Sequence, residues 1–410
     1  MKTNAVITTD LFQVLEPLLV VARVAGFLPV TSEKKGSQYS IEESLKFKIY
    51  SYVLATILTV LALLGLNEDL PIEHSIRMKN SLIKYIVVVD LGEIVVTVFT
   101  GVLTTPFKLK YFWKILNSFT KMEKVFSIHR TSDERQRSIL YMGVSLTIVA
   151  FVLAYDAVLW IINASDMSVF FKRYTALYIL YFLVFIQEFP FYFFARLVKR
   201  NIENLNGALK RGLEEVLRTQ NKQWAPIIKL GQEHPVNTST SGLTYDRLTD
   251  YMKLVEEIDD TIEATNDFCA VHTLLILFSC LLHLVVTPYF LLVEICNGGY
   301  LPFTFLQLVW IFVHTCRLMV IVEICQSGVN EYQKTINLVL KLWTSPLPLN
   351  IKEQVEILTV QISNKKIKFS SFGMMKISRS ILTAFGGSVT TFLVILFQYG
   401  GTKGTVYVRS

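Results

Sequence analysis

Long apolar stretches recur along the chain, and each has about the length that a membrane-spanning helix needs. A helix rises ~1.5 Å per residue, so crossing a ~30 Å hydrocarbon layer takes about 20 residues. Seven stretches qualify: 49–66, 85–105, 139–162, 174–195, 269–293, 301–322 and 380–399. None alternates apolar and polar positions as a barrel strand does. The pattern therefore predicts an all-α, polytopic membrane protein with seven transmembrane helices.

The connections between these stretches alternate in length, which puts the long ones on one side of the membrane. The first, third and fifth have 18, 11 and 7 residues, whereas the second, fourth and sixth have 33, 73 and 57. Within five residues of the helix ends, the long-connection side has 11 Lys or Arg residues and the other side has 4. Because positive charge gathers in cytoplasmic loops, we expect a cytoplasmic N-terminus (1–48) and an extracellular C-terminus (400–410). The Asn163-Ala164-Ser165 glycosylation sequon then lies outside the cell.

Two of the cytoplasmic segments each present one apolar helical face. The faces consist of Leu11, Val14, Leu15, Leu18 and Val21 in 1–48, and of Phe112, Ile115, Leu116, Phe119, Met122 and Phe126 in 106–138. The first face predicts an amphipathic helix that lies either on the membrane or against the helix bundle. The second predicts a helix that packs against other helices.

The remaining long connections, 196–268 and 323–379, are predicted to form helices that project into the cytoplasm. The expected helices are 201–217 and 248–265, separated by a polar break at 231–242, and 329–342 and 351–360, separated by Pro346 and Pro348. The periodicity fits solvated rods and a packed assembly platform equally well.

The composition agrees with a membrane protein and excludes other classes. Apolar residues make up 52% of the chain and charged residues only 18%, whereas soluble domains are about a quarter charged. The five cysteines form neither a disulfide framework nor a CxxC pattern. Nucleophile elbows, phosphate-binding loops and metalloprotease motifs are also missing from the sequence. We expect no enzyme activity, cofactor, metal site or nucleic-acid partner; membrane lipid is the expected surrounding.

Polar residues inside the predicted membrane helices mark a candidate ligand pocket, because charge is costly there and usually functional. Gln307, Trp310, His314 and Arg317 share one helical face at steps of 3, 4 and 3. Asp156, Trp160 and Tyr178 come from neighbouring helices, as do Tyr181, His283, Tyr289 and Glu294. Polar groups would bind the hydroxyls of a small ligand such as a sugar, while aromatic rings cover its apolar face. The same residues also fit a structural polar network, in which Arg317 pairs with Asp156 or Glu188.

A second acidic feature lies in the stretch 85–105. Asp90 and Glu93 are three residues apart and share one helical face. As a pair they would attract cations; alternatively, they are bundle-facing carboxyl groups without a role in function.

The last predicted helix contains a short motif. It reads Gly386-Gly387-Ser388-Val389-Thr390-Thr391-Phe392-Leu393-Val394-Ile395-Leu396-Phe397-Gln398-Tyr399. Thr391, the apolar residues 393–397 and Gln398 match the C-terminal signature of insect gustatory receptors, which is Thr-Tyr, five apolar residues and Gln-Phe. Phe392 and Tyr399 depart from it by aromatic exchange. The segments 15–29 and 372–377 also look similar to this family, so the chain resembles insect gustatory receptors throughout.

The resemblance implies a ligand-gated, non-selective cation channel related to insect odorant receptors. Four such subunits, identical or mixed with related receptors, would share a pore in the plasma membrane of a sensory neuron. Residues 49–322 would hold the pocket, with extensions at 106–138 and 196–268; residues 323–379 would form anchor helices and 380–399 the pore helix. The pore and gate would include Thr391, Phe392, Phe397, Gln398 and Tyr399, with a hinge at Gly386 and Gly387.

The expected ligand is a tastant, with a sugar favoured by the mixture of polar and aromatic residues. A bitter or repellent tastant remains an alternative within the same family. A G-protein-coupled receptor or a transporter remains the alternative outside it.

Overall fold

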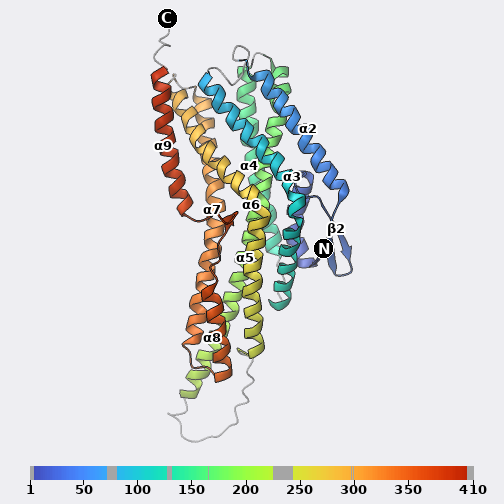
Figure 1. Cartoon of the computed structure of the whole chain (residues 1–410), viewed down its shortest axis with the longest axis vertical. Helices are drawn as coiled ribbons and strands as arrows, with labels where there is room; N and C mark the ends of the chain where they lie inside the picture. Colours follow the sequence, from blue (N-terminus) through green and yellow to red (C-terminus); the bar gives the residue numbers. More distant parts are fainter. Residues whose placement is uncertain are drawn as a thin grey trace.

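The computed structural model describes residues 4–403 except 72–80, 127–131, 165, 225–242, 297 and 299. Long helices dominate this part of the chain (Figure 1). The helices are α1 (Thr9–Val24), α2 (Leu45–Asp69), α3 (Ser81–Phe126), α4 (Ser132–Asn163), α5 (Met167–Trp224), α6 (Tyr245–Cys296), α7 (Leu301–Trp343), α8 (Leu349–Asn364) and α9 (Ser380–Lys403). The strands are β1 (Asn4–Thr8), β2 (Val30–Lys35), β3 (Gln38–Glu43), β4 (Ser370–Ser371) and β5 (Met375–Lys376).

The predicted membrane stretches all fall within helices. Among the described residues, the six helices α2 to α7 are long and apolar enough to cross a membrane, and α9 adds a shorter apolar helix over Ser380–Leu396. These seven helices run roughly along the long axis of the molecule (Figure 1). The predicted all-α, polytopic fold is therefore confirmed. The sequon at Asn163 is not tested, because Ser165 and the Asn163 side chain lie outside the described residues.

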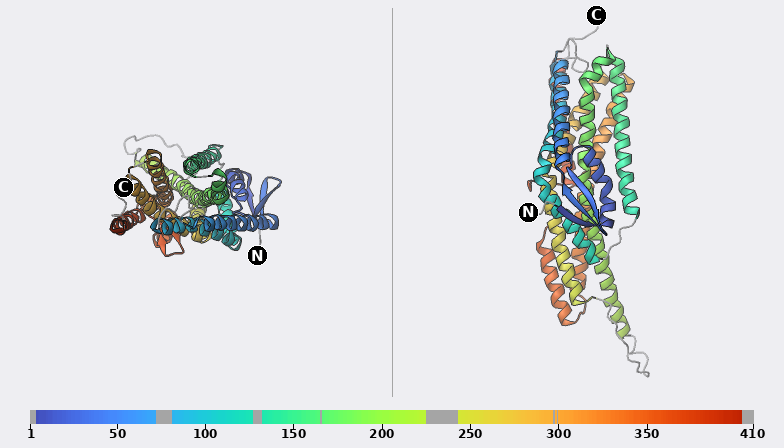
Figure 2. Two further views of the ribbon diagram at one scale, coloured as in Figure 1. Left: turned by 90° about the horizontal axis from the view of Figure 1, so that it is seen from above. Right: turned by 90° about the vertical axis from the view of Figure 1, so that its right-hand side faces the viewer.

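Beyond their apolar parts, α5, α6 and α7 continue and pack with α8 into a narrower extension (Figures 1 and 2). The helices predicted in 196–268 and 323–379 lie within these four elements, and Pro346 and Pro348 fall between α7 and α8. The polar break predicted at 231–242 lies outside the described residues. Thr335 Oγ1 donates to Asn206 Oδ1 at 2.6 Å, and Asn206 Nδ2 donates to the Glu331 carbonyl at 2.9 Å. The extension is therefore packed internally rather than built from separate rods.

The N-terminal segment forms a small antiparallel sheet, in the order β1-β3-β2, that the apolar periodicity did not indicate. Thr8, at the end of β1, begins α1 by accepting the Leu11 N–H on its hydroxyl at 3.2 Å. Phe12 of α1 stacks on Tyr39 of β3 with ring centroids 3.7 Å apart. The predicted apolar face of α1 is buried except for the partly buried Val21, and α1 contacts α4 and α5, so the helix packs on the bundle.

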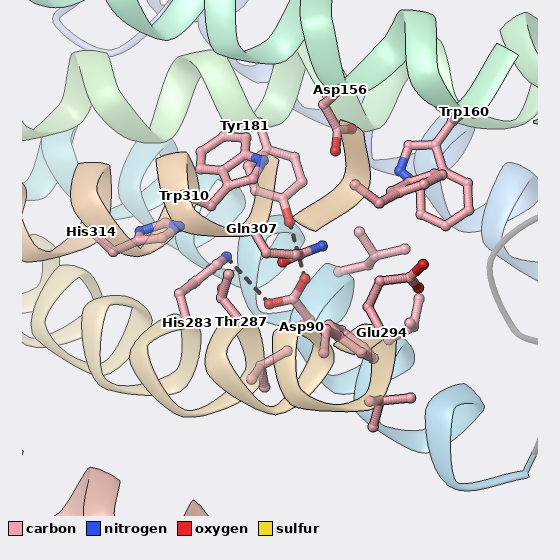
Figure 3. Close-up of a pocket in the computed structure, with 16 residues that line it drawn as sticks. Asp90, Asp156, Trp160, Tyr181, His283, Thr287, Glu294, Gln307, Trp310 and His314 are labelled. Atoms are coloured by element: carbon pink, nitrogen blue, oxygen red, sulfur yellow. Dashed lines mark hydrogen bonds and ion pairs between the residues drawn. The ribbon is translucent and has the colours of Figure 1, made fainter. Parts of the chain in front are cut away.

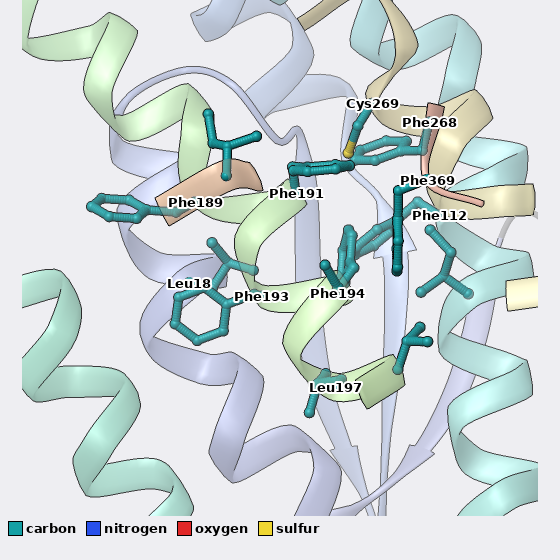
Figure 4. Close-up of a cluster of buried hydrophobic side chains, with 14 of the residues drawn as sticks. Leu18, Phe112, Phe189, Phe191, Phe193, Phe194, Leu197, Phe268, Cys269 and Phe369 are labelled. Carbon is teal, nitrogen blue, oxygen red and sulfur yellow. The ribbon is translucent and has the colours of Figure 1, made fainter. Parts of the chain in front are cut away.

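A cluster of buried aromatic rings packs α3, α5 and α6 together (Figure 4). The rings of Phe112 on α3, Phe194 on α5 and Phe268 on α6 pack with centroids 5.6 to 6.1 Å apart. Phe369, in the segment that leads to α9, packs edge-on against Phe191 at 6.2 Å. The predicted face of 106–138 lies in this region and is buried from Phe112 to Met122; the Phe126 side chain lies outside the described residues.

Candidate functional site

A cavity of about 390 Å³ lies among α3, α4, α5, α6 and α7 (Figure 3). Its walls are formed by Val87, Asp90, Leu91, Asp156, Trp160, Tyr181, His283, Val286, Thr287, Phe290, Val293, Glu294, Phe303, Gln307, Trp310 and His314. Glu294 and Phe303 are close to the α6–α7 connection, and His314 is the lining residue farthest along α7 from it. Small-molecule sites have volumes of about 300–1,000 Å³, so this cavity suits a small ligand.

One stripe of α7 forms a wall of the cavity. Phe303, Gln307, Trp310 and His314 follow at steps of 4, 3 and 4, which keeps them on one helical face. Pro302 lies in the first turn of α7, where its missing N–H costs no hydrogen bond. Just outside the helix, the Tyr300 N–H donates to Glu294 Oε1 at 3.0 Å. That bond ties the end of α6 to the start of α7.

Asp90 connects three helices at one side of the cavity (Figure 3). Its Oδ2 accepts the Tyr181 hydroxyl at 3.1 Å, and its Oδ1 lies 3.2 Å from His283 Nε2. The other ring nitrogen of His283, Nδ1, lies 2.8 Å from the Ser279 carbonyl oxygen. Both nitrogens of His283 thus face oxygen acceptors. The carboxylate, imidazole and phenol form a polar group that ligand hydroxyls can join.

Aromatic rings line the same region of the cavity. The His283 ring stacks on His314 with centroids 4.2 Å apart, and His314 stacks on Trp310 at 5.3 Å. Nearer the α6–α7 connection, Trp160 packs edge-on against Phe303 at 5.0 Å. The Asp156 carboxylate accepts the Tyr178 hydroxyl. The wall of the cavity therefore combines the flat faces of aromatic rings with carboxylate groups and one side-chain amide.

A buried ion pair contacts His314, at the end of the cavity farthest from the α6–α7 connection. Arg317 Nε donates to Glu188 Oε1 at 2.7 Å, and Arg317 Nη1 donates to His314 Nδ1 at 3.0 Å. Because a guanidinium only donates, Nδ1 of His314 is the acceptor and Nε2 carries the hydrogen. The guanidinium also lies over the Phe185 ring at 4.3 Å. This arrangement fixes the orientation of His314.

The structure brings five of the seven predicted ligand-binding residues to the cavity wall: Asp156, Trp160, Gln307, Trp310 and His314. Tyr178 and Arg317 do not line it; the first contacts Asp156 and the second supports His314 while pairing with Glu188. Of the other residues considered, Tyr181, His283, Glu294 and Asp90 are lining residues, whereas Tyr289 is not. Glu93 is buried but does not line the cavity, and it accepts the Thr97 hydroxyl.

Sequence reasoning missed much of the α6 wall. Thr287 and Phe290 lie between His283 and Glu294 at steps of 4, 3 and 4, the same spacing as on α7. Val286 and Val293 also line the cavity from α6. The lining residues Val87 and Leu91 on α3 and Phe303 on α7 were missed as well. The helical spacing from His283 to Glu294 could have indicated Thr287 and Phe290 as residues of the same face. The signal was weak, because α6 is apolar on several faces and no single face stands out as the inward one.

The predicted pore residues lie on α9 at the edge of the bundle (Figure 1). The helix is continuous through Gly386 and Gly387, and the hydroxyls of Thr390 and Thr391 donate to the carbonyls of these glycines at 2.9 Å. Phe392 is half exposed. Gln398 is exposed as well, and the side chains of Phe397 and Tyr399 lie outside the described residues.

The arrangement is suited to binding. Over the described residues, there is no group of three His, Cys, Asp or Glu side chains able to hold a metal ion. The cavity instead combines hydrogen-bond acceptors, donors and ring faces within one small volume. Such a combination favours a small polar molecule with an apolar face.

Comparisons with known proteins agree along almost the whole chain. A family model described as 7tm Chemosensory receptor matches residues 15–401. The "Gustatory receptor for sugar taste 43a" of Drosophila melanogaster is 25% identical over 94% of this chain and 98% of its own length. The "Putative gustatory receptor 28b" of the same fly is 22% identical over 36% of this chain and 33% of its own length.

Solved structures show the same fold. The insect olfactory receptor OR5 from Machilis hrabei superposes with a TM-score of 0.66 at 10% identity, covering 95% of this chain and 98% of the receptor. The same receptor in complex with eugenol gives a TM-score of 0.56 at 11% identity, covering 94% and 97%.

Proposed function

The chain belongs to the 7tm chemosensory receptor family, and we propose that it is a gustatory receptor acting as a tastant-gated, non-selective cation channel in the plasma membrane of a sensory neuron. The resemblance of its last helix to gustatory receptors supports the channel. The match to a relative named for sugar taste supports the gustatory role.

The cavity is the proposed tastant site, with a sugar as the ligand. The observation that carries this proposal is the Asp90 group, in which a carboxylate, an imidazole and a phenol meet beside the stacked rings of His314 and Trp310. Sugar hydroxyls both donate and accept, so they pair with carboxylate oxygens and with N–H or O–H groups. The apolar face of the sugar ring would lie on an indole. Asp156 and Gln307 add further polar partners on the facing helices.

The proposed orientation puts the N-terminus and the extension of α5 to α8 in the cytoplasm. The excess of Lys and Arg on that side supports it. The cavity then lies toward the outer half of the membrane, near the short α6–α7 connection, where a dissolved tastant has access.

The pore is proposed to form from α9 of four subunits, in a homotetramer or a mixed tetramer with related receptors. Half-exposed apolar side chains on α9, among them Phe392, Val394 and Ile395, are consistent with contact to lipid or to another subunit. Thr391, Phe397, Gln398 and Tyr399 would line or close the pore, and Gly386 and Gly387 would serve as the hinge.

Gating would follow from a population shift, in which the tastant binds the open state more tightly than the closed one. A tenfold difference in affinity is worth ~1.4 kcal/mol per site, so four sites together give ~5.5 kcal/mol. That total is enough to move a channel from mostly closed to mostly open.

Whole-cell current from cells that express this chain alone tests the proposal. Sugars and bitter compounds would be applied outside while G-protein signalling is blocked. We expect a rapid cation current in response to sugars. A current only with bitter compounds would replace the ligand assignment, and a response abolished by the G-protein block would contradict the channel.

A further inference from the structure

A second cavity, which we call the basic cleft, lies between α4 and α5 beside α1 and α7. It measures about 700 Å³, and its charged lining consists of Arg137, Arg196, Lys199, Arg200, Glu134 and Glu203. We propose that this cleft, with the apolar groove beside it, binds a phosphoinositide, a membrane lipid whose inositol headgroup carries phosphate groups.

The charges in the basic cleft are only partly compensated. Arg200 donates to Glu134 at 3.0 Å and to Glu203 at 3.2 Å, and Lys199 Nζ lies 3.7 Å from Glu203. Arg137 and Arg196 form no ion pair with any carboxylate in the described part of the chain. Four cationic groups against two carboxylates leave two positive charges for an anionic ligand.

The mixed lining fits a phosphorylated inositol ring better than a lone phosphate. Guanidinium groups bind phosphate oxygens through two parallel hydrogen bonds. A carboxylate has lone pairs enough to accept a ring hydroxyl in addition to its pair with Arg200, and both Glu134 and Glu203 line the cleft. The volume also exceeds what a single phosphate ion fills.

The cleft lies at the level expected for lipid headgroups. Arg196 directly follows the apolar stretch of α5, which ends at Ala195, and Arg137 comes just before the apolar stretch of α4. Basic pockets between membrane helices on the cytoplasmic side are a known setting for phosphorylated headgroups. The leaflet assignment rests on the proposed orientation; the binding itself does not.

An apolar groove adjoins the cleft on its membrane side. It measures about 200 Å³ between α4, α5 and α7, and Tyr192 lines both the groove and the cleft. Ile148 and Phe312 on its walls are 50% and 68% exposed, so the groove opens toward the hydrocarbon. An acyl chain would occupy the groove while its headgroup occupies the cleft. A soluble inositol phosphate would use only the cleft.

The groove also contacts the Glu188–Arg317 ion pair that orients His314 in the tastant cavity. Glu188 and Arg317, which fix His314, line the groove on its inner side. A bound acyl chain would therefore pack against the ion pair beneath the tastant site.

Lipid binding by the full-length protein in nanodiscs tests this inference. The probe is fluorescent phosphatidylinositol bisphosphate in phosphatidylcholine. A surface basic residue contributes about fivefold to such binding, so Arg137→Gln combined with Arg196→Gln should weaken it about thirtyfold. Arg135→Gln is the matched control, because Arg135 lies on the same helix but pairs with Glu16 at 2.9 Å outside the cleft. Melting temperatures in phosphatidylcholine alone show whether each variant is folded.

Further arms separate the possible ligands. Ile148→Trp, which narrows the groove, should weaken lipid binding but leave binding of soluble inositol trisphosphate unchanged. The site would be overturned if the folded double variant bound the lipid probe as tightly as the unmodified protein does. It would also be overturned if phosphatidylserine displaced the probe as well as unlabelled phosphatidylinositol bisphosphate does. Insensitivity of lipid binding to Ile148→Trp would overturn the acyl-chain part of the proposal and would show that the cleft recognises the headgroup alone. The readout needs no tastant, so its failure is distinguishable from failure of the proposed channel function.

Discussion

Arg379, the residue before α9, forms a forked ion pair with Glu323 of α7, with Nε–Oε1 and Nη2–Oε2 distances of 2.8 and 2.9 Å. The same continuous helix α7 carries Trp310 and His314 on the cavity wall. The pair thus joins the helix that would contact the tastant to the helix that would line the pore. If a ligand displaces α7 as proposed, this pair would connect the movement directly to α9.

Arg379→Gln should reduce the coupling between tastant binding and channel opening. We expect a several-fold shift of the half-maximal tastant concentration to higher values, with little change in melting temperature because the pair is exposed. Lys365→Gln is the control, since it removes a 3.1 Å pair with Asp259 within the extension. Equal dose–response curves for the two variants would show that the Glu323–Arg379 pair does not transmit the signal.

Trp310→Ala should weaken the tastant response while leaving ion selectivity unchanged. The indole forms part of the cavity wall and stacks on His314, so its loss removes the ring on which a sugar would lie. We expect roughly a tenfold higher half-maximal concentration. Leu308→Ala is the matched control on the same helix, because Leu308 is half exposed and lies outside the cavity. An unchanged response in Trp310→Ala would mean that the stripe is structural.

Asp90→Asn should weaken the response to hydroxylated ligands in particular. The carboxylate accepts the Tyr181 hydroxyl and lies 3.2 Å from His283 Nε2, so it joins two other lining residues of the cavity. A hydrogen bond to a charged group contributes about 1.5–3 kcal/mol, which is roughly a ten- to hundredfold change in affinity. Glu93→Gln serves as the comparison, because that side chain lies one turn away and bonds Thr97. Similar losses in both variants would assign Asp90 to the structural network.

Gly65→Ala should destabilise the bundle where α2 meets α5. A Cβ at Gly65 would lie 2.0 Å from the Arg173 carbonyl oxygen, so the helices would have to separate. Overpacking of this kind costs about 1–3 kcal/mol. Gly92→Ala on α3 meets nothing within 4 Å and should be tolerated. The melting temperatures of the two purified variants give the comparison, and equal values would contradict the close approach.

The membrane helices and the α7 stripe were predictable for a simple physical reason. A membrane helix must be apolar over a fixed length, so its ends are marked by polar residues in the sequence. Gln307, Trp310 and His314 stood out because polar and amphipathic groups are rare in such a helix. Their common face follows from helical spacing alone.

Other features needed the structure. Thr287 and Phe290 line the cavity, but α6 is apolar on several faces and gave no unique inward side. The strand β3 carries Glu42 and Glu43 within six residues, too short and too polar for an apolar pattern to indicate. For Arg317 the sequence left open a place at the ligand and a pair with Asp156 or Glu188; the structure shows the pair with Glu188, because partner choice between helices depends on packing.

Ion current through the purified protein in a planar bilayer tests the central claim most directly. With no other protein present, the account predicts cation-selective openings when a sugar is added on the side opposite the N-terminus, and none when it is added on the other side. Sugar binding by the same preparation without any conductance would contradict a self-sufficient tastant-gated channel.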